Sequence, residues 1–564
     1  MSLDFDRLVF GWWDHCMFLG LLGISLLIGI YFGFFSKQDS VNEYLFGGKS
    51  INYFPVAISI LVSCISGIAL LGIPTEVYQR GSQVWAAAIS MILVGLIMAY
   101  VAMPVFFNLQ VSSSFEYLER RFSKNVRTFS SILYIFSLLL YMPVVIFIPA
   151  LAFSQVTGHS IHLISPLLCA VCIFYTSMGG VKAVVWTDTI QFIFLILGTL
   201  SILVLGIQSV GGVSNGYEIA NEGGRLIFFE AIFLLSTGWG SIQIICTVIG
   251  LLIYAKYHDC DPKDAKLIGR YDQILPFYVM DIAGSMNGLP GIFLAGLTSS
   301  ALATMSACLN TLSGTIYDTL IDPWIPDKPG KEAKAANIMK STTVMAGITT
   351  IGMILVIEQL GTVYEISMSL TSVDGPLLGL FLLGMLFPWV GKKGAMVGAC
   401  SSLVVTIWLI IGQQWYKSQK IVRYPDLPMS IDGCLNLGLF NATRTTISKA
   451  FTSLANETLK NMTIGSDSRQ VTKNGFATIY RLSMVYFTLI GTITAIIVGL
   501  ITSFVVGEMD LSKVDPEHIS PAIRRFFPRE KFYSRVPPKE AELVTMSPKP
   551  DITAKVTDIP DLIH

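Results

Sequence analysis

The sequence predicts an all-α membrane protein with about twelve spans. Of its 564 residues, 53% are hydrophobic and only 13% are charged, and the mean hydropathy is +0.63, whereas a soluble domain is roughly one quarter charged. The apolar segments are long enough to cross a bilayer, and none shows the alternating pattern of a membrane β-barrel strand. The formal net charge is zero, which argues against a basic surface that binds nucleic acid.

The apolar segments follow one another along most of the chain. They cover residues 16–35, 53–74, 83–107, 128–153, 161–178, 184–208, 232–255, 289–320, 337–357, 364–389, 394–414 and 480–506. We therefore predict a transmembrane domain over residues 1–510 and a largely disordered cytoplasmic tail over residues 511–564. The tail contains a basic, aromatic stretch at 522–535, which can lie along anionic lipid or stay solvated.

Positive charge in the first half predicts the orientation, because lysine and arginine gather in cytoplasmic loops. Basic residues follow the first, third and fifth segments, at Lys37, Lys49, Arg120, Arg121, Lys124, Arg127 and Lys182. These alternate loops should be cytoplasmic. The expectation is a multi-pass plasma membrane protein with its N-terminus outside.

The second half gives a conflicting count. The polar loop 415–479 holds three N-x-T glycosylation acceptors, at Asn441, Asn456 and Asn461, which indicates an extracellular loop and a cytoplasmic C-terminus. Counting back from there places the loop 321–336 inside, whereas counting from the N-terminus places it outside. An odd number of crossings is therefore missing between Lys182 and Lys328.

Several stretches resemble the sodium:solute symporter family. They are "TSMGGVKAVVWTDTIQ" (176–191), "LLIYAKYHDCDP" (251–262), "DQILPFYVMD" (272–281), "LPGIFLAGLTSSALATMSACLN" (289–310) and "DGPLLGLFLLGM" (374–385). The resemblance is strongest to the branch of sodium-coupled monocarboxylate, multivitamin and iodide transporters. It implies a LeuT-type fold, in which two inverted five-helix repeats enclose a midplane site. One extra N-terminal helix and two extra C-terminal helices complete the domain.

The same resemblance locates the missing crossing. In the family a further span precedes the helix that ends "IYAKYHDCDP", and here "RLIFFE" runs directly into that helix. The sixth core helix is therefore predicted to be absent, with the join near Glu230 and Ala231.

The resemblance also implies a sodium site at a broken helix. The stretch "LVSCISGIALLGIP" (61–74) has Gly67, Gly72 and Pro74 interrupting an apolar run. By motif match the sodium ligands are the carbonyls of Val62 and Ile65, a carbonyl at Ser300 and the hydroxyl of Thr304. Ala303 stands where the family has a second hydroxyl residue. Read without the resemblance, the small residues serve only close helix packing.

Two intramembrane carboxylates are candidates for function, because a charge within a span is costly. Asp188 matches a residue near the inner sodium exit of the family, and its alternative role is to cap a helix start. Asp374 precedes "GPLLG", where the family has a small residue. It is either an extra cation or proton ligand, or a residue that faces a water-filled pathway.

The substrate pocket is expected beside the helix break. The candidate residues are small or apolar, namely Cys64, Ser66, Ala69, Ala87, Ala88 and Met91. Few amide or carboxylate side chains are available for sugar hydroxyls, which favours a small anion with an apolar body. Cys260 and Cys434 lie in polar loops and can pair if both loops are extracellular.

These observations predict a secondary transporter and not an enzyme. No nucleophile elbow, phosphate loop or zinc signature occurs, and the only expected cofactor is sodium as coupling ion. The predicted partners are a small anionic solute, Na⁺ and membrane lipid, with self-association of the chain left open. The alternative is a non-transporting truncated isoform that acts as a sensor or regulates a full-length symporter.

Overall fold

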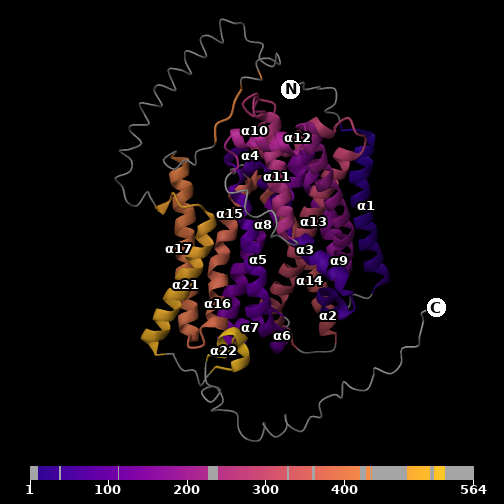
Figure 1. The fold of residues 1–564 in the computed structure, drawn as a ribbon. Helices are drawn as coiled ribbons and strands as arrows, with labels where there is room; N and C mark the ends of the chain where they lie inside the picture. Colours follow the sequence, from indigo (N-terminus) through magenta and orange to yellow (C-terminus); the bar gives the residue numbers. More distant parts are fainter. Residues whose placement is uncertain are drawn as a thin grey trace, which may run out of the picture.

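A computed structural model describes residues 10–36, 40–111, 113–226, 239–326, 330–358, 363–419, 427–431, 434, 479–507 and 514–526. Within these ranges the chain forms one helical bundle (Figure 1). Its main helices are α1 (Trp12–Phe35), α3 (Tyr53–Cys64), α4 (Gly67–Arg80), α5 (Ala87–Ile97), α6 (Met103–Leu109), α8 (Lys124–Thr157), α9 (Ile161–Ser209), α11 (Trp239–Tyr257), α13 (Leu289–Ile316), α14 (Lys331–Ile357), α15 (Val363–Thr371), α16 (Gly375–Leu386), α17 (Lys392–Ser418) and α21 (Val485–Val506).

The number of crossings agrees with the sequence prediction. In the described residues nine helices are long and apolar enough to span a bilayer, or eleven when two bent pairs each count as one span. The longest, α9, breaks its helical geometry at Gly180 (φ 54°, ψ −155°). This break falls between the predicted segments 161–178 and 184–208, so the two parts of α9 correspond to two predicted spans. The all-helical fold class is therefore confirmed.

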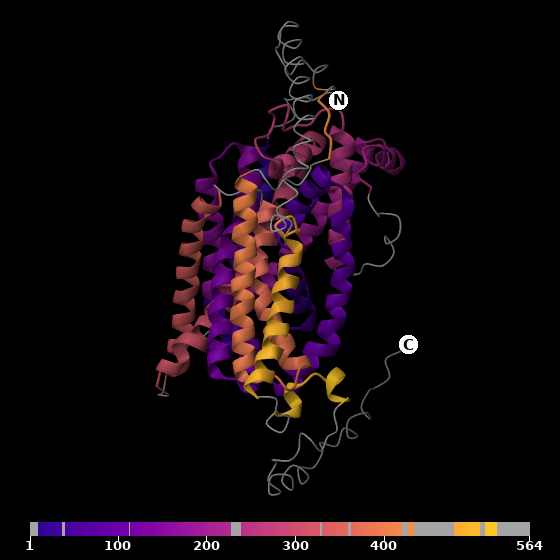
Figure 2. The same cartoon turned by 90° about the vertical axis from the view of Figure 1, so that its left-hand side faces the viewer.

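The two ends of the bundle carry different short helices. α10 (Val213–Glu222) and α12 (Ile274–Ala283) lie at one end, called here the α10 end, together with the start of α1 and the end of α4 (Figure 1). α2 (Val41–Phe46), α7 (Ser114–Arg121) and α22 (Pro521–Arg524) lie at the opposite end, called the α7 end. α17 and α21 stand side by side along one edge (Figure 2).

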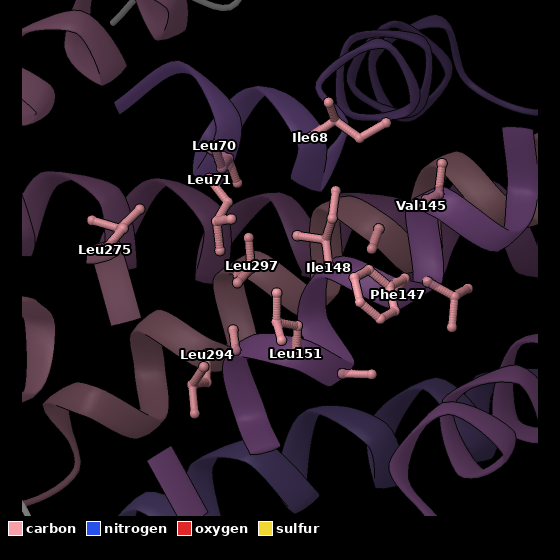
Figure 3. Packing of buried hydrophobic residues seen from close by; sticks show 14 of the residues in the cluster. Ile68, Leu70, Leu71, Val145, Phe147, Ile148, Leu151, Leu275, Leu294 and Leu297 are labelled. Atoms are coloured by element: carbon pink, nitrogen blue, oxygen red, sulfur yellow. The ribbon is translucent and has the colours of Figure 1, made fainter. Parts of the chain in front are cut away.

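Helix α13 runs through the centre and is held there by close packing. Phe147, Ile148 and Leu151 of α8 meet Leu294 and Leu297 of α13 in the main apolar cluster (Figure 3). Small residues let neighbouring backbones approach, as is usual for helices in lipid. A methyl group added at Gly296 would lie 2.7 Å from the Phe194 carbonyl oxygen of α9.

α9 and α11 both end at the α10 end. Gly206, near the end of α9, packs against Tyr278 of α12, which lies at the α10 end. His162, at the start of α9, lies 3.7 Å from Glu358, the residue that follows α14. Arg225, which follows α10, stacks 4.1 Å from the ring of Tyr254, close to the end of α11. Two spans in succession thus arrive at the same end, and no helix in the described residues returns the chain between them.

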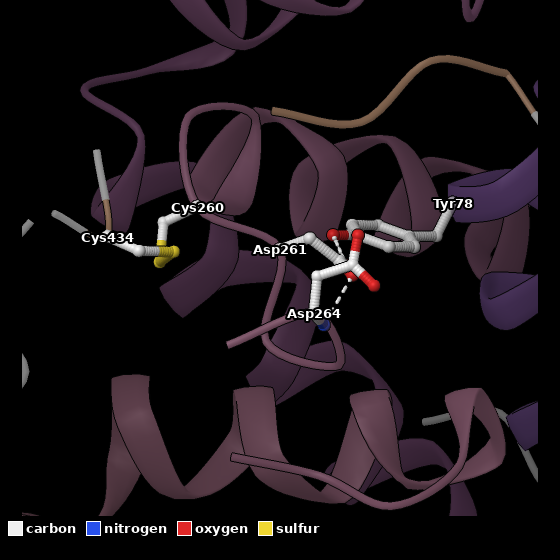
Figure 4. Close-up of a disulfide and its surroundings, with 5 residues drawn as sticks. All are labelled: Tyr78, Cys260, Asp261, Asp264 and Cys434. Carbon is white, nitrogen blue, oxygen red and sulfur yellow. Dashed lines mark hydrogen bonds between the residues drawn. A yellow bond between two sulfur atoms is a disulfide. The ribbon is translucent and has the colours of Figure 1, made fainter. Parts of the chain in front are cut away.

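A disulfide joins two loops at the α10 end, between the two cysteines that the sequence marked as a possible pair. Cys260 bonds to Cys434 with a Cα–Cα distance of 4.9 Å (Figure 4). The neighbouring segment 427–431 crosses the ends of the helices, where Leu427 N–H donates to the Gln79 carbonyl and Asp261 N–H donates to the Ser430 carbonyl, each at 3.0 Å. Loop 415–479 is therefore anchored to the bundle through its described part.

Candidate functional site

The candidate ion site begins at a gap in a helix. α3 ends at Cys64 and α4 begins at Gly67, with a bend of 44° between them. Ile65 (φ −86°, ψ 86°) lies outside helical geometry, so the carbonyls before it lose their usual intrahelical partners. Gly72 and Pro74 lie inside α4. The predicted interruption is therefore correct at Gly67 and wrong at these two residues, because α4 continues through both.

Two hydroxyl side chains of α13 meet this gap. Ser300 Oγ donates to the Ile65 carbonyl, and Thr304 Oγ1 donates to the carbonyls of Ser63 at 3.1 Å and Ser300 at 3.0 Å. The Val62 carbonyl instead accepts the N–H of Ile65 at 3.0 Å. The structure thus brings Ile65, Ser300 and Thr304 together, and it adds the Ser63 carbonyl, which the motif match did not include.

A buried carboxylate lies beside the same helix. Asp188 is fully buried on the second half of α9, and Ser59 Oγ of α3 donates to its Oδ2 at 2.5 Å. Its Oδ1 has no hydrogen-bond partner among the described residues. Ser63 lies close to the same carboxylate. The helix-capping alternative is wrong, because Asp188 lies inside α9 and contacts a neighbouring helix.

The substrate candidates are only partly brought together. Cys64 is exposed, Ser66 is buried and Ala69 is half-buried around the helix gap. Ala87, Ala88 and Met91 lie on α5, and their side chains fall outside the described part of the structure. The glycosylation acceptors Asn441, Asn456 and Asn461 also lie outside the described residues.

A cavity of about 780 Å³ opens near the α7 end. Polar residues on one face of α13, among them Asn310, Thr311 and Thr315, share its wall with Asp374 and Tyr134. These α13 residues were not among the site residues predicted from the sequence. Thr304, Thr311 and Thr315 are spaced by seven and then four residues, which places them on one face of a helix. This spacing in the sequence could have identified that polar face.

This arrangement of oxygen atoms is suited to binding a cation. Carbonyls, hydroxyls and one carboxylate are ligands for hard cations. In the parts of the chain that are described, no three histidine, cysteine or acidic side chains gather as transition-metal ligands. Carbonyls at a broken helix that faces a partner helix are a recurrent way to hold sodium in transporters with inverted repeats.

The chain is similar in sequence to known sodium-coupled transporters. The model of the sodium:solute symporter family matches residues 44–222 and 229–401. Sodium-coupled monocarboxylate transporter 1 of Xenopus laevis is 33% identical, with 88% of this chain and 86% of that protein covered. The sodium-dependent multivitamin transporter of Oryctolagus cuniculus is 31% identical, with 90% and 85% covered.

A solved structure of a Na⁺-coupled sialic acid symporter has the same fold, with a TM-score of 0.64 at 19% identity and coverage of 88% of this chain and 98% of that one. The alignment with the Xenopus relative extends over 546 positions. It covers 88% of the 564 residues of this chain, or about 496 residues. The difference means that about 50 residues of that relative have no counterpart in this chain. With a family match over most of its transmembrane region, this chain belongs to the sodium:solute symporter family.

Proposed function

We propose that the chain binds sodium at the gap between α3 and α4 and couples sodium entry to uptake of a small anion. The proposed solute is a monocarboxylate, a vitamin such as biotin or pantothenate, or an iodide-like anion. The relatives named above support this solute class, and so do the small or apolar candidate residues at the gap.

One observation carries the sodium assignment, namely the fully buried Asp188 with an unpartnered oxygen next to the gap. An isolated buried carboxylate is strongly disfavoured unless it is neutralised or paired. The nearby Ile65 and Ser63 carbonyls and the Thr304 hydroxyl add neutral oxygens. A sodium ion among these groups would offset the cost of burying the charge.

We further propose that the α10 end faces the outside of the plasma membrane, with the N-terminus outside and the C-terminal tail in the cytoplasm. A disulfide between Cys260 and Cys434 suits an oxidising compartment, and the same loop carries the three glycosylation acceptors. Lys124 and Lys392 begin α8 and α17, and each lies within three residues in sequence of the contact between Arg121 of α7 and Val390. Arg127 is in the first turn of α8. These basic residues are expected on the cytoplasmic side.

Loss of the sixth core helix should impair transport. Only twelve residues, 227–238, connect Leu226 to Trp239. A helix of twelve residues is about 18 Å long, which is shorter than the ~30 Å thickness of the hydrocarbon core. The family match is interrupted at the same place, between 222 and 229. The alternative function is therefore a non-transporting isoform that senses the solute or regulates a full-length symporter.

Binding of ²²Na⁺ to the purified chain in nanodiscs tests the sodium site separately from transport. We expect Thr304→Ala and Asp188→Asn each to weaken binding at the gap at least ~10-fold, or about 1.4 kcal/mol. Ser306→Ala is the matched control, because Ser306 is equally buried on α13 and donates to its own helix at the Ala303 carbonyl. Equal ²²Na⁺ binding by all four proteins would refute the assignment.

Uptake into expressing cells tests the coupling. Labelled lactate, biotin, pantothenate and iodide are offered with sodium or with N-methylglucamine in its place. We expect weak or no sodium-dependent uptake by this chain, and recovery when a relative's sixth core helix is inserted between Leu226 and Trp239. Sequencing the transcript across codons 225–235 shows whether an additional exon exists. Full uptake by the unaltered chain would rule out the impairment.

A further inference from the structure

After its last span the chain returns to the α7 end, where the C-terminal segment 514–526 packs on the bundle (Figure 1). Ser520 N–H donates to the Met385 carbonyl near the end of α16 at 3.0 Å. Tyr117 Oη of α7 donates to the His518 carbonyl, also at 3.0 Å. Ser520 is fully buried. The segment is therefore anchored to two separate parts of the membrane domain.

The C-terminal segment lies at the lipid-facing rim of the bundle. Its short helix η12 (Pro516–His518) packs against α6 and α7, and α22 packs against η4 (Met98–Ala102), which joins α5 to α6. The same span leaves Tyr100, Met103 and Phe107 exposed by 70%, 54% and 74%, as expected for apolar side chains that face a membrane. No residue of the segment lines the cavity near the α7 end. The segment thus stands beside the lipid-facing surface and not over the interior.

The segment ends in basic and aromatic side chains that the bundle does not cover. Arg524, Arg525 and Phe526 are all exposed, Phe526 by 76%. In the sequence, residues 522–535 hold five basic residues against one acidic residue, together with four aromatic residues. A cluster of about four to eight lysines and arginines just beyond a span is typical of segments that bind anionic lipid. The anchored segment therefore brings the start of such a cluster to the edge of the membrane domain.

The charge of the two arginines is not neutralised within the described residues. Neither of them forms an ion pair there, not even with Asp515 or Glu517, the carboxylates of the same segment. Arg120 of α7 shows the contrast, because it is also exposed at this end but pairs with Glu116 on its own helix. The two arginines thus keep their positive charge available for an external anion.

We propose that Arg524, Arg525 and Phe526 form a binding surface for anionic phospholipid at the α7 end. Guanidinium groups bind phosphate and carboxylate oxygens through paired, charge-assisted hydrogen bonds, and an exposed phenyl ring suits the boundary between headgroups and acyl chains. Because the segment is already anchored, lipid binding has less chain freedom to remove. The proposal depends neither on the proposed transport function nor on which side of the membrane the α7 end faces.

Native mass spectrometry of the purified full chain, titrated with phosphatidylserine in detergent, measures the Kd of the first bound lipid. One basic residue near an anionic surface changes affinity about fivefold. We therefore expect the double variant Arg524→Gln, Arg525→Gln to raise this Kd at least ~10-fold. Arg120→Gln is the matched control, since Glu116 already neutralises that charge, and its Kd should change less than about twofold. Phosphatidylcholine should bind equally to all three proteins.

Hydrogen exchange in nanodiscs tests the same contact in a bilayer. We expect residues 521–526 to exchange more slowly with ~30% phosphatidylserine than in phosphatidylcholine alone, and ~0.5 M NaCl to remove the difference. Glycerophosphoserine, the free headgroup, should not compete at equal concentration, because it has no acyl chains. Three results would each overturn the proposal: an unchanged Kd in the double variant, an equal loss in Arg120→Gln, or full displacement of the lipid by glycerophosphoserine.

Discussion

Arg121 should be far more important for stability than its neighbour Arg120, although the sequence presents the two as an equivalent basic pair. Arg121 is buried at the end of α7, and its guanidinium donates to four backbone carbonyls in and after α16. The distances are 3.1 Å to Gly384, 3.3 Å to Phe387, 3.0 Å to Pro388 and 3.2 Å to Val390. Arg121 therefore fixes α7 to the turn between α16 and α17.

The magnitude follows from these four contacts. A hydrogen bond from a charged donor contributes about 1.5–3 kcal/mol, and orphaned buried acceptors cost more. Because the four bonds share one side chain and are not additive, we expect Arg121→Ala to cost about 3–5 kcal/mol. Arg120 is 43% exposed and pairs with Glu116 on its own helix, so Arg120→Ala should cost under ~1 kcal/mol.

Thermal unfolding in detergent, followed by size-exclusion fluorescence, measures the difference. With ~1–2 °C per kcal/mol in a chain of this size, the apparent Tm of Arg121→Ala should fall by about 3–10 °C. Arg121→Lys should recover less than half, because an ammonium cannot reach the carbonyls as a fork. The reasoning fails if Arg121→Ala melts within ~1 °C of the wild type, or if Arg120→Ala loses as much.

Three further predictions concern other parts of the fold. Gly296→Ala should lower the free energy of unfolding by about 1–3 kcal/mol, because the new methyl meets α9 backbone, whereas Gly20→Ala, with nothing within 4 Å, should be neutral in the same melt. Cys434→Ser should raise hydrogen exchange in residues 427–431 and leave exchange in α13 unchanged; equal exchange in both proteins would contradict the anchoring role. Burial lowers the pKa of His518 below its usual 6.5, so packing of residues 516–524 on the bundle should be strongest above pH ~6.5 and should weaken as pH falls toward the lowered value. Hydrogen exchange at pH 7.5 and 5.5 measures this weakening, and His518→Gln should abolish the pH dependence.

Much of the architecture was accessible from the sequence, for a physical reason. Lipid offers no partner for backbone polar groups, so each long apolar segment must be a helix, and each of the twelve predicted segments overlaps a helix in the described residues. The sequence marked Cys260 and Cys434 as candidates for pairing, because both lie in polar loops outside the apolar segments. Local composition was sufficient to predict the helices, whereas the pairing of the two cysteines stayed a possibility, because sequence does not give the distance between them.

Contacts between distant segments were not accessible in the same way. In the sequence, Arg121 indicated only the membrane topology. Its hydrogen-bond acceptors lie more than 260 residues later in the chain, so no local pattern pointed to them. Pro74 looked like a helix break but lies inside α4. Ser137 had no local signal that joined it to Asp374, and only packing of α8 against η9 (Ser372–Asp374) brings the two side chains together. Tertiary packing decides such sites.

The proposed sodium site and the proposed loss of the sixth core helix concern different parts of the fold. The gap between α3 and α4 belongs to the first repeat, and its partners Thr304 and Asp188 lie on α13 and α9, all of which are present. The inverted partner of α3–α4 in a LeuT-type fold is the first helix of the second repeat, and no helix in the described residues takes its place. Rocking of one bundle against the other requires both repeats, whereas ion binding requires only the groups at the gap. Under the proposed function, such a chain binds sodium while moving little solute, so sodium binding and uptake need to be measured as separate quantities.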